Sequence, residues 1–212
     1  MSRTKGAGVL LRRAAAAEAT MWRSLWLWAR RRHRHLAPGE ETFAYAGVAK
    51  PILGVFIGLS VVELPIFDLI VRHVVPWRPA RWIVLTLGVW GLLWMIGFLA
   101  SMTVHPHRTD GAGIRVRLSA RIDVLVPWED VEAVRKSYRS LPSSRSVQVE
   151  EEGERRVLSV VVASQTSVDV RLRRPTTFDL PAGRSEPVDE VRFYTDDPDG
   201  LVRRAQILPS TA

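Results

Sequence analysis

The chain contains no cysteine, and this absence excludes disulfides, thiolate metal ligands and cysteine nucleophiles. It also lacks the glycine-rich patterns that cradle phosphates and dinucleotides, the Gly-x-Ser-x-Gly turn of serine hydrolases and the His-Glu-x-x-His motif of zinc proteases. The sequence therefore predicts a protein that is not an enzyme, with no catalytic residue, no cofactor and no metal site.

Acidic residues are scarce at the start of the chain. Residues 1–35 contain nine Lys or Arg residues and one acid, whereas residues 108–212 contain seventeen residues of each sign. A nucleic-acid-binding protein needs its positive charge on the folded recognition surface, so nucleic acid is not an expected partner. Positive charge beside an apolar segment instead favours attraction to anionic lipid headgroups.

Lysine is scarce as well, with three Lys against 27 Arg, a bias that indicates a bacterial coding sequence. The first 30 residues also lack the uninterrupted apolar run of a secretory signal peptide. An Arg-rich, acid-poor start is typical of organelle transit peptides too, and this stays an alternative for residues 1–35.

Residues 1–35 are predicted to form a basic amphipathic segment, with a helix over residues 9–30. Basic side chains fall near one side of this helix, and apolar side chains lie opposite. The predicted lipid-interface residues are Arg12, Arg23, Arg30, Trp22, Trp26 and Trp28. This pattern is typical of a helix in the headgroup plane, with packing against the protein's own domain as the alternative.

Residues 36–107 contain two long apolar runs. Residues 51–71 correspond to roughly 32 Å of helix at about 1.5 Å per residue, enough to cross a hydrocarbon core of about 30 Å. Residues 82–104 contain no charged side chain. Because the ten residues 72–81 between them include two prolines, the runs predict an antiparallel transmembrane hairpin.

The orientation of the hairpin is predicted from the basic residues at its ends. Nine of them lie in residues 1–35, ahead of the first run, and three lie in the connecting loop. Since Lys and Arg concentrate on the cytoplasmic side, the loop is expected outside and both termini in the cytoplasm. The predicted location is the bacterial plasma membrane.

Three polar residues in or directly after the first run are candidate site residues. A charged side chain inside a span is costly and usually faces protein or water. Glu63 lies near mid-span, and the indole N–H of Trp90 or Trp94 is expected to donate to it. Asp68 precedes Arg72 by four residues, a spacing that predicts an ion pair. We expect a structural role for Glu63, with proton relay or ligand contact as the alternative.

Four glycines are predicted to bring the two spans together. Gly54 and Gly58 form a small-xxx-small motif on the first span, and Gly88 and Gly91 offer the matching surface on the second. Because the spans are tethered, packing within the hairpin is expected, and a separate dimer motif is the alternative.

Four histidines flank the spans on the predicted cytoplasmic side: His33, His35, His105 and His107. Two pairs at i, i+2 without cysteine fall short of the usual zinc spacings. Solvated side chains at the level of the headgroups are therefore expected, with a metal site as the alternative.

Residues 108–212 are predicted to form a β domain, because apolar and polar residues alternate with a period of two. Seven strands are expected, at residues 114–118, 122–126, 131–138, 145–150, 156–163, 168–172 and 189–195. A helix over residues 198–208 follows them, with Asp196 or Asp197 as its N-terminal cap.

The runs GIRVRLSARIDVLVPWEDVEAVR (113–135) and VRFYTDDPDGLVRRAQ (191–206) resemble the start and the end of bacterial pleckstrin-homology-like (PH-like) domains attached to membrane hairpins. The Pro-Gly-Glu of residues 38–40 is similar to an element that often precedes such hairpins. The resemblance implies a bent seven-stranded antiparallel sandwich or partial barrel with a C-terminal helix, and it implies no catalysis. The second basic pair of the phosphoinositide signature is missing, so phosphoinositide binding is not expected.

The predicted fold class is thus a transmembrane α-helical hairpin followed by an α+β PH-like domain. This architecture favours a non-enzymatic adaptor or scaffold that presents a cytoplasmic binding domain. The expected partners are membrane lipids and a membrane or cytoplasmic protein, with oligomerisation as a further option. The alternative is a small subunit of a membrane transporter or envelope-synthesis complex that uses Glu63.

Overall fold

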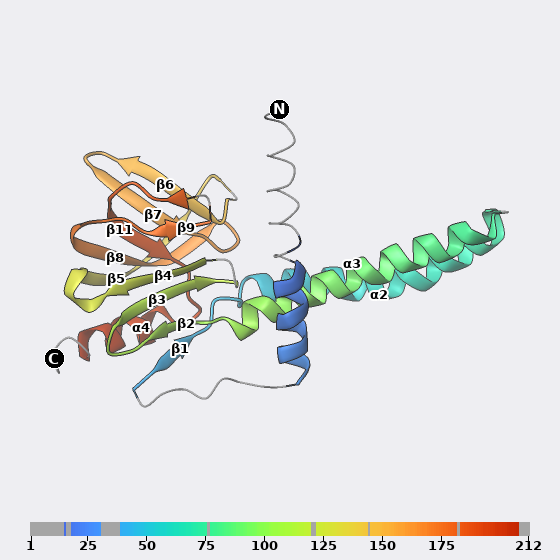
Figure 1. The fold of residues 1–212 in the computed structure, drawn as a ribbon, viewed down its shortest axis with the longest axis horizontal. Helices are drawn as coiled ribbons and strands as arrows, with labels where there is room; N and C mark the ends of the chain where they lie inside the picture. The colour runs from blue at the N-terminus through green and yellow to red at the C-terminus, as the bar shows by residue number, and fades with distance from the viewer. Residues whose placement is uncertain are drawn as a thin grey trace. The chain divides into compact units, whose positions relative to one another are not determined.

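The structure is a computed structural model that describes residues 15, 18–30, 39–75, 77–119, 122–143, 145–181 and 183–207. The chain divides into two compact units (Figure 1). One comprises Met1–Arg32 and Lys50–Ser101, and the other comprises His33–Ala49 and Met102–Ala212. The coarse prediction of two long apolar helices followed by a β-rich region is confirmed.

The first unit is built around the helices α2 (Ala49–Val74) and α3 (Arg78–Val104), both long and apolar enough to cross a membrane. Every residue of α2 is at least partly exposed, as lipid contact requires. Both helices contain the predicted runs 51–71 and 82–104, which are too short at the connecting loop. Near the loop, α2 includes Arg72 and α3 includes Arg78 and Arg81. An arginine can belong to the end of a helix because its long side chain extends away from the apolar surface while its backbone keeps the helical hydrogen bonds.

The second unit contains two main β-sheets (Figure 1). The strands of the first, in spatial order, are β1 (Glu41–Phe43), β2 (His107–Thr109), β3 (Gly113–Leu118) and β4 (Ile122–Pro127). The second has the order β5 (Val131–Ser140), β8 (Gln165–Thr176), β11 (Val188–Phe193), β7 (Arg155–Val160) and β6 (Val147–Glu152). A short ribbon pairs β9 (Asp179–Leu180) with β10 (Gly183–Arg184).

All seven predicted strands are present, as β3 to β8 and β11, with boundaries shifted by a few residues. The prediction that the strands are all antiparallel is wrong at one place, because β11 and β7 pair in parallel. Four strands were also missed, namely β1, β2 and the two-residue strands β9 and β10. Both β1 and β2 contain three residues, too few to show an alternating pattern.

The connection between β1 and β2 contains the whole helical hairpin. These strands pair antiparallel, with Glu41 opposite Thr109 and Phe43 opposite His107. Residues 41–43 and 107, predicted to belong to the hairpin segment 36–107, are therefore part of the β domain. The hairpin is an insertion between two adjacent, hydrogen-bonded strands.

The core of the β domain is formed by the inward-facing residues of the alternating strands. Ile114, Leu158, Val170 and Phe193 are fully buried. The helix α4 (Pro198–Ile207) packs against β5 and β2, and its own Leu201 is buried. Each sheet thus buries one face, and α4 covers an end of both.

The predicted cap of the C-terminal helix is confirmed at one of its two candidate residues. Asp197 Oδ1 accepts a hydrogen bond of 2.8 Å from the backbone N–H of Gly200. Asp196 instead accepts hydrogen bonds from the N–H of Gly47, and its own N–H donates to Ala44 O. The segment before α2 is in this way fastened to the end of the β domain.

Candidate functional site

The hairpin satisfies one of the two acids of α2 with its own arginine. Arg81 of α3 donates from Nε to Asp68 Oδ1 at 2.7 Å and from Nη2 to Asp68 Oδ2 at 2.8 Å. The predicted ion pair between Asp68 and Arg72 is therefore wrong. Arg81 lies on the neighbouring helix and faces the carboxylate, so it can form two parallel hydrogen bonds with Asp68. This paired geometry favours Arg81 over Arg72 as the partner.

Glu63 has no such partner. Its side chain is exposed, and no residue in the described part of the chain forms a hydrogen bond or ion pair with it. The predicted indole donors are engaged elsewhere: the ring of Trp90 lies 5.2 Å from that of Trp22, and Trp94 stacks on Phe98 at 5.9 Å. The prediction of a tryptophan donor within the hairpin is wrong.

The four glycines differ in their surroundings. A Cβ added at Gly88 would collide with Leu64 Cδ2, so this glycine allows the close approach of α2 and α3. A Cβ at Gly54, Gly58 or Gly91 would meet no atom within 4 Å. Packing within the hairpin therefore accounts for Gly88 alone, and the expectation is wrong for the other three.

The described N-terminal helix, residues 18–29, packs against α3. Met21 and Ser24 are buried, and a Cβ added at Gly97 would lie 3.0 Å from Met21 Cγ. Trp22 belongs to this packed side through its contact with Trp90.

The opposite side of this helix is basic and aromatic. Arg23 and Arg30 are exposed, and the guanidinium of Arg30 lies 4.1 Å from the ring centroid of Trp26. Trp28 is exposed as well, although the pattern placed it opposite the arginines on the apolar side. Arg12 lies outside the described residues. Exposed tryptophan and arginine side by side suit the headgroup region of a membrane.

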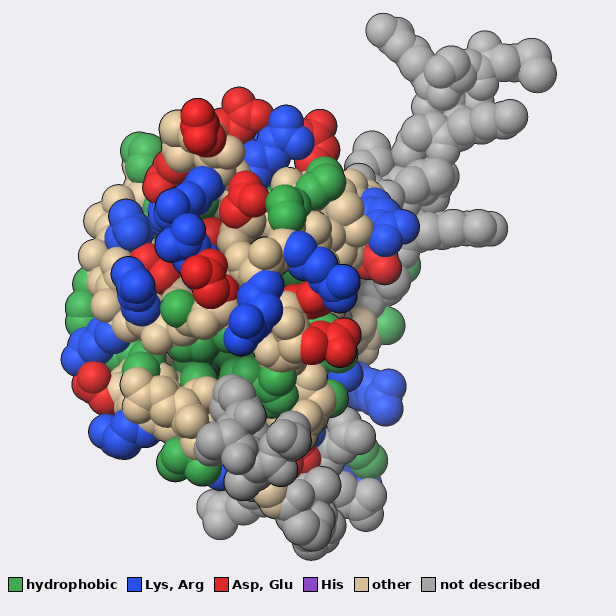
Figure 2. Space-filling view, turned by 90° about the vertical axis from the view of Figure 1, so that its left-hand side faces the viewer, with side chains coloured by type: hydrophobic (Ala, Val, Ile, Leu, Met, Phe, Trp, Pro, Cys, Tyr) green, Lys and Arg blue, Asp and Glu red, His purple; other side chains and the backbone are tan. Residues whose placement is uncertain are grey.

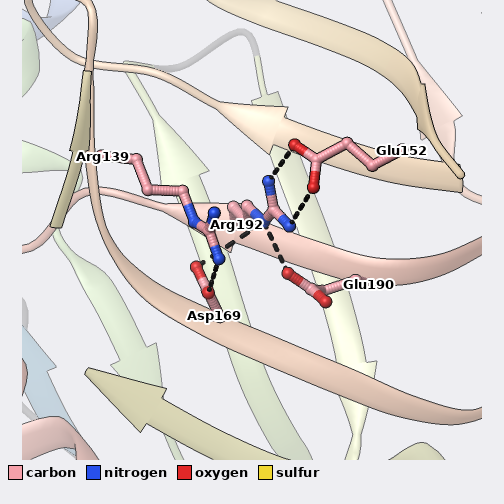
Figure 3. A network of polar contacts seen from close by, with 5 residues as sticks. All are labelled: Arg139, Glu152, Asp169, Glu190 and Arg192. Carbon is pink, nitrogen blue, oxygen red and sulfur yellow. Dashed lines mark hydrogen bonds and ion pairs between the residues drawn. The ribbon is translucent and has the colours of Figure 1, made fainter. Parts of the chain in front are cut away.

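A network of charged side chains crosses the five-stranded sheet of the β domain (Figure 3). At its centre, Arg192 of β11 binds Glu152 of β6 with two hydrogen bonds of 2.6 and 2.8 Å. Its Nε donates to Glu190 at 2.5 Å, and Arg139 of β5 binds Asp169 of β8 at 3.0 Å. Asp169 also lies 3.7 Å from Arg192 Nε, so one network links four strands.

The electrostatics of this network favour the charged forms. Burial acts to lower the pKa of Arg192, but the hydrogen bonds to Glu152 and Glu190 outweigh it, so this pKa is raised. The hydrogen bond from Arg192 lowers the pKa of Glu152. Sequence reasoning missed this network, because alternating charge on a strand usually indicates a solvated face.

His107 lies in the core of the β domain and not at the level of the headgroups, as was predicted. Its Nδ1 accepts a hydrogen bond of 2.9 Å from the N–H of Arg117, so Nε2 carries the proton and donates to Tyr194 O at 2.8 Å. The rings of Tyr45 and Phe193 lie 4.7 and 5.0 Å from it. Burial lowers the pKa of His107 to about 4. With both nitrogens engaged, the ring is a structural crosslink.

The surface of the β domain carries both signs of charge in mixture (Figure 2). Arg115 and Arg117 of β3 share one acid, Asp123 of β4, at 3.6 and 3.1 Å. An open depression beside the β6–β7 turn is lined partly by Arg156. That guanidinium is neutralised by Glu151 at 3.0 Å and Glu186 at 2.6 Å. These arginines are therefore engaged by the protein's own acids.

Among the described residues, no group of three or more His, Asp or Glu side chains is arranged to hold a metal ion. His33 and His35 of the metal alternative lie outside the described part. No protein-family model matches the chain, and neither a curated protein nor a solved structure is found to be similar to it.

Proposed function

We propose that the chain is a membrane-anchored, non-enzymatic adaptor that presents a PH-like binding domain on the cytoplasmic face of a bacterial plasma membrane. The observation that carries this proposal is the insertion of α2 and α3 between the paired strands β1 and β2. A hairpin that leaves and re-enters one domain through adjacent strands needs both its ends on the same side of the membrane.

The distribution of charge supports the orientation. The basic N-terminal segment is on the side of the β domain if the hairpin crosses twice, and that side is cytoplasmic by the preference for Lys and Arg. The exposed Arg23, Trp26 and Arg30 would then meet anionic headgroups.

A protein partner fits the β domain better than an anionic ligand. The two sheets with the capping helix α4 agree with a PH-like architecture, while the parallel pairing of β11 with β7 departs from the simple antiparallel form. Since Arg115, Arg117 and Arg156 are paired with acids, no free cationic pocket is offered to a phosphate by these residues.

Protease protection tests the proposal. External protease added to spheroplasts should leave the β domain intact, and lysis should make its loops cleavable. Digestion of the β domain in sealed spheroplasts would contradict the orientation, and recovery of the chain in the soluble fraction would contradict membrane anchoring.

Glu63, which has no partner among the described residues, favours a second candidate, a small subunit of a transporter or envelope-synthesis complex. An acid inside a span that the chain does not satisfy itself is a default candidate for contact with a moving ion, lipid or helix. Glu63→Gln distinguishes the two: an adaptor keeps its function, whereas a subunit that uses the acid loses function while still inserting.

A further inference from the structure

One face of α2 carries apolar side chains at alternating spacings of four and three residues, with an acid at its centre. We call it the α2 seam, and it consists of Ile52, Phe56, Leu59, Glu63, Ile66 and Ile70. Its five apolar members are each 49–55% exposed in the isolated chain. A repeat of 3.5 residues is the pattern by which parallel helices pack knobs into holes in a left-handed coil.

The contrast with Asp68 indicates that Glu63 needs a partner from outside the hairpin. The hairpin supplies Asp68 with two hydrogen bonds from Arg81. In the described hairpin, nothing donates to Glu63. A carboxyl group facing hydrocarbon without a partner is costly, so the α2 seam is poorly suited to lipid contact alone.

We propose that two copies of the chain pair through the α2 seam, in parallel, with their Glu63 side chains facing each other. A two-fold axis along the membrane normal brings residues of equal depth together and makes the interface self-complementary. A neutral carboxylic acid both donates and accepts a hydrogen bond, so two such groups satisfy each other without a third residue. The inference rests on the proposed insertion of the hairpin in a membrane.

A single polar residue among apolar seam positions also fixes how two helices align. In coiled coils such a residue specifies register and number of strands, because any shift leaves it unpaired. Pairing through Gly54 and Gly58 is the competing arrangement. These glycines lie about 140–180° around the helix from Glu63, at 100° per residue, so that arrangement leaves both acids in lipid.

Because the chain has no cysteine, single cysteines report this interface directly. Leu59→Cys and Ile66→Cys lie on the α2 seam, and Val61→Cys is the matched control at similar depth, since the native residues are 50%, 51% and 53% exposed. In proteoliposomes with an oxidant, we expect disulfide-linked dimers from the two seam variants and few from Val61→Cys. Equal or stronger linkage through Val61→Cys or Gly58→Cys, or no linkage at all, overturns the proposal.

Substitution of Glu63 tests whether this side chain stabilises the dimer. Energy transfer between labelled copies in vesicles gives the dissociation constant of the dimer. Glu63→Gln should keep it, because an amide also donates and accepts, whereas Glu63→Leu should weaken dimerisation by about five- to thirty-fold. An unchanged constant in Glu63→Leu overturns the proposal.

The same proteoliposomes separate this inference from the proposed function. Labelling of Trp77→Cys, between the two helices, from one side of the vesicle reports insertion of the hairpin. If the hairpin inserts but the seam variants do not link, the dimer is wrong and the anchor stands. If the hairpin does not insert, the proposed function and the dimer are both wrong.

Discussion

The two units of the molecule distribute apolar side chains in opposite ways. α2 exposes its apolar side chains along its whole length, whereas the β domain buries those of its strands and pairs charges on its surface. The same residue types therefore have different consequences in the two units. The proposed membrane insertion matches the hairpin to lipid and the β domain to water, and substitutions should show this difference.

Loss of a large core side chain should have the largest effect. Phe193→Ala should lower the free energy of unfolding of the β domain by about 3–5 kcal/mol, because Phe193 is fully buried and its removal leaves a cavity. Chemical denaturation followed by circular dichroism measures it. The matched control Tyr138→Ala, at a residue that is 64% exposed, should change stability by less than about 0.5 kcal/mol. Equal effects of the two variants would contradict the assigned core.

Removal of the central arginine comes next. Arg192→Ala should cost about 3 kcal/mol, because it leaves the buried Glu190 without its cation, while Asp169 keeps Arg139. The control Arg171→Ala breaks an exposed pair with Glu132 and should cost about 1 kcal/mol or less. If both variants unfold at the same temperature as the wild type, the network around Arg192 does not contribute to the stability of the β domain.

Acid should weaken the β domain through His107. The folded pKa of about 4 lies below the usual value of about 6.5, so the unfolded state takes up the proton first. This contribution to stability is complete above about pH 6.5 and is lost as the pH falls toward 4, by up to about 1.4 kcal/mol per pH unit. His107→Gln should flatten the dependence over this window, and an unchanged slope in that variant would assign it to carboxylates alone.

The smallest effect is expected in the hairpin. Asp68→Asn should destabilise it only slightly, since Arg81 is partly exposed and can turn toward the interface. Unfolding in mixed detergent measures the change. A loss of membrane insertion in this variant would show that the ion pair is required for the hairpin itself.

The comparison also explains what the sequence could predict. Both long apolar helices and seven strands were predicted, because hydropathy and a period of two can be read along the chain without knowledge of tertiary contacts. The short β1 and β2 were missed because they form only as a pair, between residues far apart in sequence. The parallel pairing of β11 with β7 was missed for the same reason.

The candidate site was less predictable. Spacing along one helix suggested Arg72 for Asp68, although the fold places Arg81 of the next helix against it. His107 follows an apolar span and has a polar ring, so it was predicted to be solvated, yet β2 carries it into the core. Glu63 was a candidate because of its position near the middle of the first run, but that its side chain is exposed could be learned only from the structure.

The most direct test of the account is the side of the membrane on which each unit lies. Trp77→Cys, between the helices, and Glu154→Cys, on an exposed turn of the β domain, can each be treated in intact cells with a membrane-impermeant maleimide. The account predicts that Trp77→Cys is labelled at once and Glu154→Cys only after permeabilisation. Labelling of Glu154→Cys in intact cells would contradict it.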